Sequence, residues 1–277
     1  MSDTTIDAVA DAGRNSLAVA VAAARAGGSV LMHHWDRGVT IRNKSATGGH
    51  SYDLVSDADE ESEQVVASEI RRSFPGHDII GEESHVGRAD AEDVWVVDPL
   101  DGTNNYAHRV EHFAVSIAHY HRGRPAAAAI YNPATDTMHT AVAGGDAQTD
   151  GITVRVGDQT ELSGVLVGCG FYYDRGPMMR QTLAAIEALF GRDIHGIRRF
   201  GTASLDLVMV GRGWLGAFFE YQLSPWDFAA GRLFVECAGG TVTTATGDPL
   251  PLRKTSLMAS NTHLHPAMSD ILRQHHP

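Results

Sequence analysis

The sequence contains little cysteine, little positive charge and no long uninterrupted apolar run. Its two cysteines, Cys169 and Cys237, are too few for a disulfide framework, so we expect two small, half-buried free thiols. With 22 Lys and Arg against 34 Asp and Glu, the formal net charge is −12. This charge argues against direct nucleic-acid binding or an anionic-membrane surface, because both partners reward basic faces.

The N-terminus is acidic and lacks the basic-then-apolar form of an export signal. The alanine-rich stretch from Leu17 to Ala24 is too short to cross a bilayer. These absences predict a cytoplasmic protein with no membrane segment.

The sequence also shows no repeat, no heptad seam and no evident linker, so its 277 residues, 43% of them hydrophobic, are expected to form a single domain, 1–277. Helical spacing of apolar residues predicts a long first helix from Asp7 to Trp35, with Gly27 and Gly28 as a weak point. A second helix is expected over Asp57–Phe74. We predict an α+β fold in which an N-terminal α+β half (about 1–150) packs on a C-terminal α/β half (about 151–277).

The remaining elements follow from strand and turn patterns. A hairpin turn is expected at Thr149–Gly151. The expected strands are Val94–Val97, Phe113–His121, Ala126–Tyr131, Thr137–Ala143, Val165–Gly168, Ile197–Phe200, Leu215–Glu220 and Leu257–Ser260. The further helices are expected over Met178–Phe190, Ala203–Val210 and Pro225–Ala238, with a short one at the C-terminus.

In the stretch VWVVDPLDGTNN an apolar run ends on two carboxylates, those of Asp98 and Asp101. Pro99 cannot extend a sheet ladder, so we expect the chain to turn there. Gly102 permits a tight turn and close approach of backbone N–H groups to a ligand, and Thr103 supplies a hydroxyl at an expected helix start. Carboxylates so close repel each other unless a cation lies between them, and oxygen-only ligands select Mg²⁺, Mn²⁺ or Ca²⁺ over zinc. A turn of this type without metal is the alternative.

Such an arrangement would let an acidic protein bind a small phosphorylated substrate, because metal ions and a helix N-terminus both attract phosphate. Two further acidic positions could join it. Asp227, in SPWDFAAG, follows a capping Ser224 and Pro225, so it could also serve only to stabilise a helix. Glu82 and Glu83, in IIGEES, could equally form a solvated turn.

Taken in chain order, IIGEES, WVVDPLDGTNNYAH and SPWDFAAGRLFVECAGG resemble the three metal-site motifs of the inositol monophosphatase family. DLVSDAD and RRFGTASLDLVMVGRGWLGAFFE resemble its flanking segments, so the resemblance spans roughly Asp7 to Ile271. It implies a layered αβαβα fold, Mg²⁺-dependent phosphatase activity, sensitivity to lithium and a homodimer.

The resemblance also implies a set of two or three cations. The first would be held by Glu82, Asp98 and the Leu100 carbonyl. The second would be held by Asp98, Asp101 and Asp227. Mn²⁺ or Ca²⁺ can occupy the same sites, and Glu82 would also face a third, weaker ion.

Other positions match the family's substrate-handling residues. Asp53 and Thr103 match the pair that orients the attacking water. Gly102 and Thr103 would present backbone N–H groups to the phosphate. The positions that would contact the substrate alcohol are Gly201, Thr202, Ala203 and Glu220. Lys44, in a polar loop, matches a lysine near the third ion or is simply solvated.

These residues predict a phosphomonoesterase that needs no serine or cysteine nucleophile, because bound cations activate water. Glu220 suits hydrogen bonds to ring hydroxyls or to an ammonium group, which favours inositol monophosphate, with histidinol phosphate as the nearest alternative. A different class of function is a dimeric protein-interaction role in RNA metabolism or transcription. The complete acid set argues against a protein that has lost catalysis.

Some features resist assignment. The sequence assigns no contact to Cys169. Arg175, Arg198 and Arg199 could contact a substrate or a neighbouring subunit, and surface salt bridges are the favoured interpretation. The histidines are expected to form no metal cluster, because His119 and His121 have no carboxylate partner at ligand spacing along the chain.

Overall fold

The computed structural model describes residues 3–38, 41–43, 54–171 and 174–277. The first half of the chain forms a seven-stranded sheet of order β3-β4-β5-β6-β7-β8-β9, in which only β3 and β4 are parallel. Its strands are β3 (Asp78–Gly81), β4 (Asp93–Asp101), β5 (Ala114–His121), β6 (Arg124–Asn132), β7 (Thr137–Val142), β8 (Gln148–Thr149) and β9 (Ile152–Thr153). The turn expected between β8 and β9 is confirmed, with Asp150 and Gly151 both at positive φ.

The second half forms a five-stranded sheet of order β11-β10-β12-β14-β13. Its strands are β10 (Leu166–Cys169), β11 (Gly196–Arg198), β12 (Ala217–Leu223), β13 (Gly240–Thr243) and β14 (Thr255–Asn261). A separate antiparallel pair joins β1 (Ile41–Asn43) to β2 (Leu54–Ser56). The sequence analysis missed β13, whose four residues carry only one buried apolar side chain, Val242.

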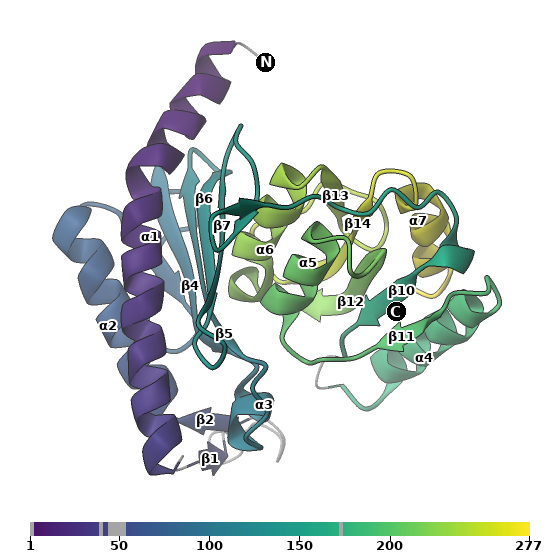
Figure 1. Ribbon diagram of the computed structural model, residues 1–277, viewed down its shortest axis with the longest axis horizontal. Coiled ribbons are helices and arrows are strands. Elements are labelled where there is room, and N and C mark those ends of the chain that lie inside the picture. Colours follow the sequence, from purple (N-terminus) through teal and green to yellow (C-terminus); the bar gives the residue numbers. More distant parts are fainter. Residues whose placement is uncertain (1–2, 39–40, 44–53, 172–173) are drawn as a thin grey trace.

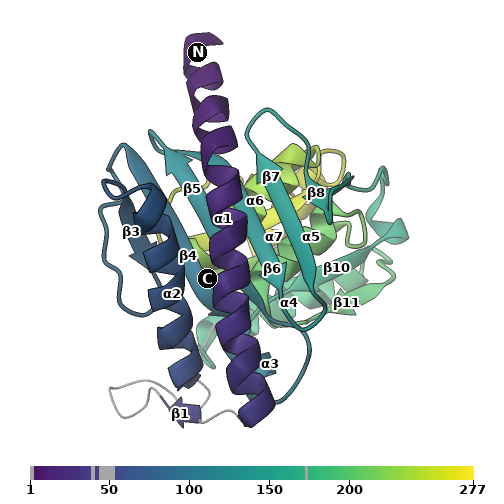
Figure 2. The same ribbon diagram turned by 60° about the vertical axis from the view of Figure 1, so that its left-hand side comes forward.

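The helices are α1 (Asp3–Arg37), α2 (Asp57–Ser73), α3 (Thr103–Ala107), α4 (Pro177–Phe190), α5 (Ala203–Gly211), α6 (Pro225–Cys237) and α7 (His265–Gln274). They form three layers around the two sheets (Figures 1 and 2). Helices α1 and α2 cover the outer face of the seven-stranded sheet, α5 and α6 lie between the sheets, and α4 and α7 cover the far face of the five-stranded sheet. The predicted αβαβα order is confirmed.

Alternation along β4 explains how both faces of one strand are buried. Trp95 and Val97 pack in the cluster that includes α1 and α2, whereas Val94 and Val96 pack against α5 and α6. A strand covered on both faces reads as a continuous apolar run, which is what VWVV is. The strand therefore carries its polar residues only at its two ends.

Helix α1 is continuous through the glycines that were expected to weaken it. A Cβ on Gly27 would lie 2.8 Å from both Ser62 Oγ and Val66 Cγ2 of α2, and one on Gly28 would lie 2.6 Å from Tyr131. These glycines permit close packing instead of breaking the helix. Among the described helices, α1 alone has the length and apolar composition that crossing a membrane would require, and its apolar face packs on α2 and the sheet.

The chain does not turn at Pro99 as expected. Strand β4 runs on to Asp101, and its register against β5 shifts between Asp98 and Asp101. Between these pairs two residues of β4, Pro99 and Leu100, oppose one of β5, Val115, which is a β-bulge, and a bulge is where a strand tolerates proline. The bulge interrupts the regular pairing of β4 with β5 just before the strand ends at Asp101.

Candidate active site

A pocket of about 610 Å³ opens where β4 and β12 end and where α3, α5 and α6 begin. It contains four acids that the sequence singled out, Glu82, Asp98, Asp101 and Asp227, and we call it the acid pocket. The structure also brings the other described candidates into its wall, namely Leu100, Gly102, Thr103, Gly201, Thr202, Ala203 and Glu220. Asp53 and Lys44 lie outside the described residues.

The bulge of β4 is held in place by hydrogen bonds around Asp98, which is only 1% exposed. The Leu100 backbone N–H donates to Asp98 Oδ1 (3.0 Å), and Ser62 Oγ of α2 donates to the Pro99 carbonyl (3.1 Å). Gly102 then turns the chain into α3 at a φ of 92°. A Cβ there would lie 2.3 Å from Thr202 Oγ1, so both the backbone angle and the space require glycine.

Asp101 reaches across to the second half of the chain. Its carboxylate accepts hydrogen bonds from the backbone N–H groups of Ala203 (3.3 Å) and Ser204 (2.7 Å), at the start of α5. A carboxylate at this end also suits the helix dipole. Asn105 of α3, which the sequence analysis did not single out, supports the same junction by donating to the carbonyls of Phe200 and His112 (both 2.8 Å).

Asp227 has both of the roles left open by its sequence position. Its Oδ2 accepts a hydrogen bond from the Ser224 backbone N–H (2.6 Å) and completes a capping box at the start of α6. The same carboxyl group lines the acid pocket. Helix capping thus fixes the position of a pocket acid.

The segment that carries Glu82 is held by Glu63 of α2, a residue that the sequence analysis missed. The Glu63 carboxylate, 1% exposed, accepts hydrogen bonds from the Glu83 and Ser84 backbone N–H groups (2.9 and 2.8 Å) and from Ser84 Oγ (2.6 Å). Burial alone would raise the pKa of Glu63, but these bonds and one to His85 lower it overall. An anionic Glu63 therefore fixes the turn beside Glu82.

Three carboxyl groups in the acid pocket resist ionisation in the absence of cations. Burial, followed by the negative charges of Glu82, Asp101 and Asp227, raises the pKa of Asp98 well above its usual value. Burial raises the pKa of Asp101 to about 6 despite its hydrogen bonds, and burial with the charge of Asp101 raises that of Asp227. Lys254, which also lines the pocket, acts to lower the pKa of Asp227, but burial and the charge of Asp101 outweigh it.

Thr103 is the one hydroxyl at the head of α3. Its Oγ1 donates to the Leu100 carbonyl (3.1 Å) and lies 3.5 Å from Oδ1 of Asp59 on α2, which is 1% exposed. The sequence analysis named Asp53 for this position and missed Asp59. The signal was present, since Asp59 falls within the same motif, DLVSDAD, but the motif alone does not say which of its acids faces Thr103.

The far wall of the pocket is formed by Glu220 of β12, which is 8% exposed. Burial raises its pKa to about 8, although the charge of Arg199 acts to lower it. A Cβ on Gly170 would lie 1.7 Å from Glu220 Oε2, so glycine there makes room for this carboxyl group. The neighbouring Cys169 is a buried free thiol whose pKa burial raises to about 12, which excludes it as a nucleophile at neutral pH.

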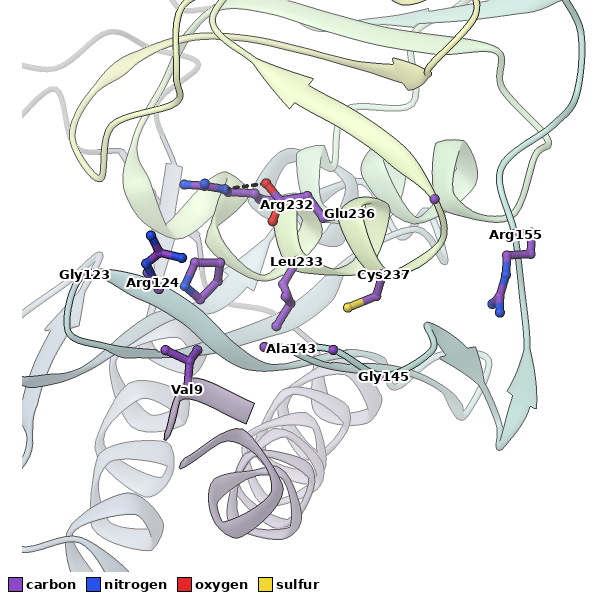
Figure 3. Close-up of a pocket in the computed structure, with 13 residues that line it drawn as sticks. Val9, Gly123, Arg124, Ala143, Gly145, Arg155, Arg232, Leu233, Glu236 and Cys237 are labelled. Carbon is purple, nitrogen blue, oxygen red and sulfur yellow. Dashed lines mark hydrogen bonds and ion pairs between the residues drawn. The ribbon is translucent and has the colours of Figure 1, made fainter. Parts of the chain in front are cut away.

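A larger pocket of about 760 Å³ lies elsewhere, between the N-terminal part of α1, the β6–β7 region and α6 (Figure 3). It contains none of the four acids. Its arginines are engaged, since Arg232 bonds Glu236 (2.9 Å) and Arg155 bonds Asp146 (2.6 Å). The volume of a pocket therefore does not identify the active site, whereas the convergence of several acids does.

Residues 14–276 match the sequence profile of the inositol monophosphatase family. The chain belongs to this family. The protein named Nus factor SuhB from Salmonella typhimurium (strain LT2) is 38% identical over 254 residues, covering 91% of this chain and 93% of that protein. The protein named inositol-1-monophosphatase from Rhizobium meliloti (strain 1021) is 36% identical over 223 residues, covering 80% of this chain and 84% of that protein.

Among solved structures of the family, the extragenic suppressor protein suhB from Bartonella henselae superposes with a TM-score of 0.84 at 33% identity. The match covers 92% of this chain and 97% of that one. Both the fold and the family resemblance predicted from the sequence are confirmed.

Inositol monophosphatases are metal-dependent phosphatases, and the acid pocket fits the group they require. Its candidate ligands are all oxygens, which hard divalent cations prefer. The raised pKa values of Asp98, Asp101 and Asp227 show that these groups ionise only against burial and, for Asp98 and Asp227, the charges of neighbouring acids, a cost that a bound cation would offset.

Proposed function

We propose that the chain is a Mg²⁺-dependent phosphomonoesterase that hydrolyses inositol monophosphate or a similar small polyol phosphate. The observation that carries the proposal is the acid pocket itself, in which buried carboxylates share one space with the N-terminal end of α5. The residues that would hold the cations are Glu82, Asp98, the Leu100 carbonyl, Asp101 and Asp227.

Bound Mg²⁺ would supply a more acidic water and neutralise charge on the phosphoryl oxygens. The protein's own residues would do the positioning. Thr103 Oγ1, between the Leu100 carbonyl and Asp59, would orient the attacking water, with Asp59 as proton acceptor for the hydroxyl. The backbone N–H groups of Gly102 and Thr103, freed by the left-handed turn, would face the phosphate.

The alcohol side of the substrate would lie against Gly201, Thr202, Ala203 and Glu220. The Thr202 hydroxyl already donates to the His112 carbonyl (2.7 Å), so we assign substrate contact to the backbone of this segment and to Glu220. A carboxyl group there suits ring hydroxyls. The related Rhizobium protein carries the name inositol-1-monophosphatase, which supports the same substrate class.

The test is release of inorganic phosphate with and without Mg²⁺ from inositol 1-phosphate, histidinol phosphate, fructose bisphosphate and a 3′-phosphoadenosine compound. We expect Mg²⁺-dependent release, with the highest kcat/KM for inositol 1-phosphate. A higher value for histidinol phosphate would redirect the substrate assignment. No release from any of the four compounds would refute the enzyme proposal.

Related proteins carry the name Nus factor SuhB, which supports a second candidate function, a protein-interaction role in transcription. The two roles separate genetically, because Asp98→Asn would remove catalysis and spare a surface. If a cellular phenotype of the deletion were rescued by Asp98→Asn, the interaction role would be the functional one. Homodimerisation and lithium sensitivity remain predictions, testable by sedimentation and by inhibition at millimolar Li⁺.

A further inference from the structure

Four side chains at the start of β4 take no part in the acid pocket. Asp93 begins β4, His119 and His121 lie near the end of β5, and His77 precedes β3. Asp93 pairs with His121 and Trp95 with His119, so strand alternation places Asp93, His119 and His121 on one face of the sheet. We call Asp93 and the three histidines the histidine cluster. The expectation that His119 and His121 lack a carboxylate partner was wrong, because the neighbouring strand supplies Asp93.

Asp93 is the centre of the histidine cluster. Its Oδ1 lies 2.7 Å from His121 Nδ1 and 3.1 Å from His119 Nε2, and its Oδ2 lies 3.8 Å from His77 Nε2. Ligand atoms of His77, Asp93 and His119 all lie within 4.8 Å of one another, which no other three such residues do in the described part of the chain. Two atoms bound to one tetrahedral zinc at about 2.0–2.1 Å are about 3.3–3.4 Å apart, so the pair at 3.1 Å already fits and the wider separations would close around an ion.

The histidine cluster is buried at His119 and accessible to solvent at His77 and Asp93. His119 is 2% exposed, and its Nδ1 lies 2.9 Å from Ser16 Oγ of α1. The ring of Phe74 stacks on His77, which limits its rotation. The side chains of His77 and Asp93 are 20% and 23% exposed, so an ion can reach them from solvent. A hydrogen-bonded outer nitrogen on a buried histidine is what metal ligands in proteins commonly have.

We propose that the histidine cluster binds one divalent cation of the zinc class through His77, Asp93 and His119. Imidazole nitrogens with one carboxylate suit Zn²⁺, Ni²⁺ or Co²⁺ and not Mg²⁺. His121 orients the Asp93 carboxylate. Asp98 lies five positions after Asp93 along β4, a distance of about 17 Å, so the two metal sites share no ligand. The bound cation ties the residue before β3 to β4 and β5.

The hydrogen bond from Trp95 to His77 allows the proposal to be tested, because it fixes which ring nitrogen of His77 carries the proton. The Trp95 indole N–H donates to His77 Nδ1 (3.0 Å), so the neutral ring carries its own proton on Nε2, facing Asp93. A cation on Nε2 displaces that proton, which passes to solvent or to Nδ1. Either route changes the hydrogen bond of Trp95, so the indole N–H resonance of Trp95 should shift when the cation binds.

The experiment uses the untagged full chain with excess Mg²⁺, titrated with Zn²⁺ by calorimetry and followed at the Trp95 indole resonance. We expect one Zn²⁺ per chain in addition to any in the acid pocket. His77→Gln and Asp93→Asn should each weaken its binding at least about tenfold, as losing a ligand costs no less than losing a ligand's hydrogen-bond partner. His139→Gln is the matched control, because His139 is a buried strand histidine that bonds Thr149 instead (2.9 Å).

Comparing Asp98→Asn with His77→Gln shows whether the Zn²⁺ binds in the acid pocket or at the histidine cluster. A Zn²⁺ that survives Asp98→Asn and is lost in His77→Gln supports the proposal. A Zn²⁺ that is lost in Asp98→Asn and kept in His77→Gln belongs to the acid pocket and overturns it. Absence of any Zn²⁺ binding, or binding that leaves the Trp95 resonance unchanged, overturns it as well.

Discussion

The two ends of β4 carry aspartates in opposite electrostatic surroundings. At one end Asp98 faces other carboxylates, and burial and their charges raise its pKa. At the other end burial also acts to raise the pKa of Asp93, but the hydrogen bond from His121 and the nearby imidazoles lower it overall. The same strand thus presents one acid among other carboxyl groups and one among imidazoles. The first end offers only oxygen ligands, which suit Mg²⁺, and the second offers imidazoles with one carboxylate, which suit a zinc-class cation.

The sharpest test of this contrast compares Asp98→Asn with Asp93→Asn. Asp98→Asn should lower kcat/KM for inositol 1-phosphate by at least about 10³-fold, because a catalytic cation is worth several kcal/mol of transition-state stabilisation. Asp93→Asn should leave kcat/KM unchanged. Mg²⁺-dependent phosphate release measures both. Equal losses in the two folded variants would show that the ends are not functionally distinct.

The second test asks which acid serves Thr103. Thr103→Val and Asp59→Asn should each lower kcat by about 10²-fold or more, the usual effect of losing positioned general-base assistance. Thr103→Ser keeps the hydroxyl and is the control. Because the two residues act as one unit, the double variant should lose little more than either single variant. Full activity in Asp59→Asn would return the role to Asp53.

The third test uses pH, since the two regions should respond with opposite sign. The folded pKa values of Asp101 (about 6) and Glu220 (about 8) lie above their unfolded values. Their stabilising contribution is therefore complete below about pH 4 and is lost as pH rises through 6 and 8. His119 has a folded pKa of about 4, below 6.5, so its contribution is complete above about pH 6.5 and is lost as pH falls toward 4.

Urea unfolding of the Mg²⁺-free protein across this range measures the effect. Glu220→Gln should flatten the loss of unfolding free energy between about pH 5 and 8, and added Mg²⁺ should reverse that loss. His119→Gln should flatten the loss between about pH 6.5 and 4, worth up to about 3 kcal/mol. If Glu220→Gln left the change in unfolding free energy between pH 5 and 8 the same as in the unsubstituted protein, the raised pKa of Glu220 would be wrong.

The sequence predicted the residues that line the acid pocket better than the residues that hold them in position. Glu82, Asp98, Asp101 and Asp227 each follow an apolar strand or open a helix, and such local patterns place side chains at sheet edges. Glu63 and Asn105 act across long separations, so no local pattern marks them, and the motif that contains Asp59 does not say which of its acids faces Thr103. The histidine cluster depends on the register between β4 and β5, which fixes that Asp93 faces His121. The prediction that the glycines weaken α1 was wrong for the same reason, since their role depends on which side chains pack against them.

The smallest expected effect separates the two ends through a matched pair of buried serines. Ser62 Oγ donates to the Pro99 carbonyl at the bulge, and Ser16 Oγ contacts His119. Each serine is fully buried, so each alanine variant should lower the unfolding free energy by about 1 kcal/mol per hydrogen bond lost, and Ser16 also donates to the Ala12 carbonyl (2.9 Å).

Their effects on catalysis should differ. Ser62→Ala should also lower kcat/KM by up to about tenfold, because a displaced bulge moves Asp98 and Asp101 relative to each other. Ser16→Ala should leave kcat/KM unchanged, since the bond that it removes lies at the far end of β4. Thermal unfolding and Mg²⁺-dependent phosphate release on the same preparations give both quantities. A catalytic loss in Ser16→Ala equal to that in Ser62→Ala would mean that β4 transmits strain along its length, and the two ends would have to be treated as one site.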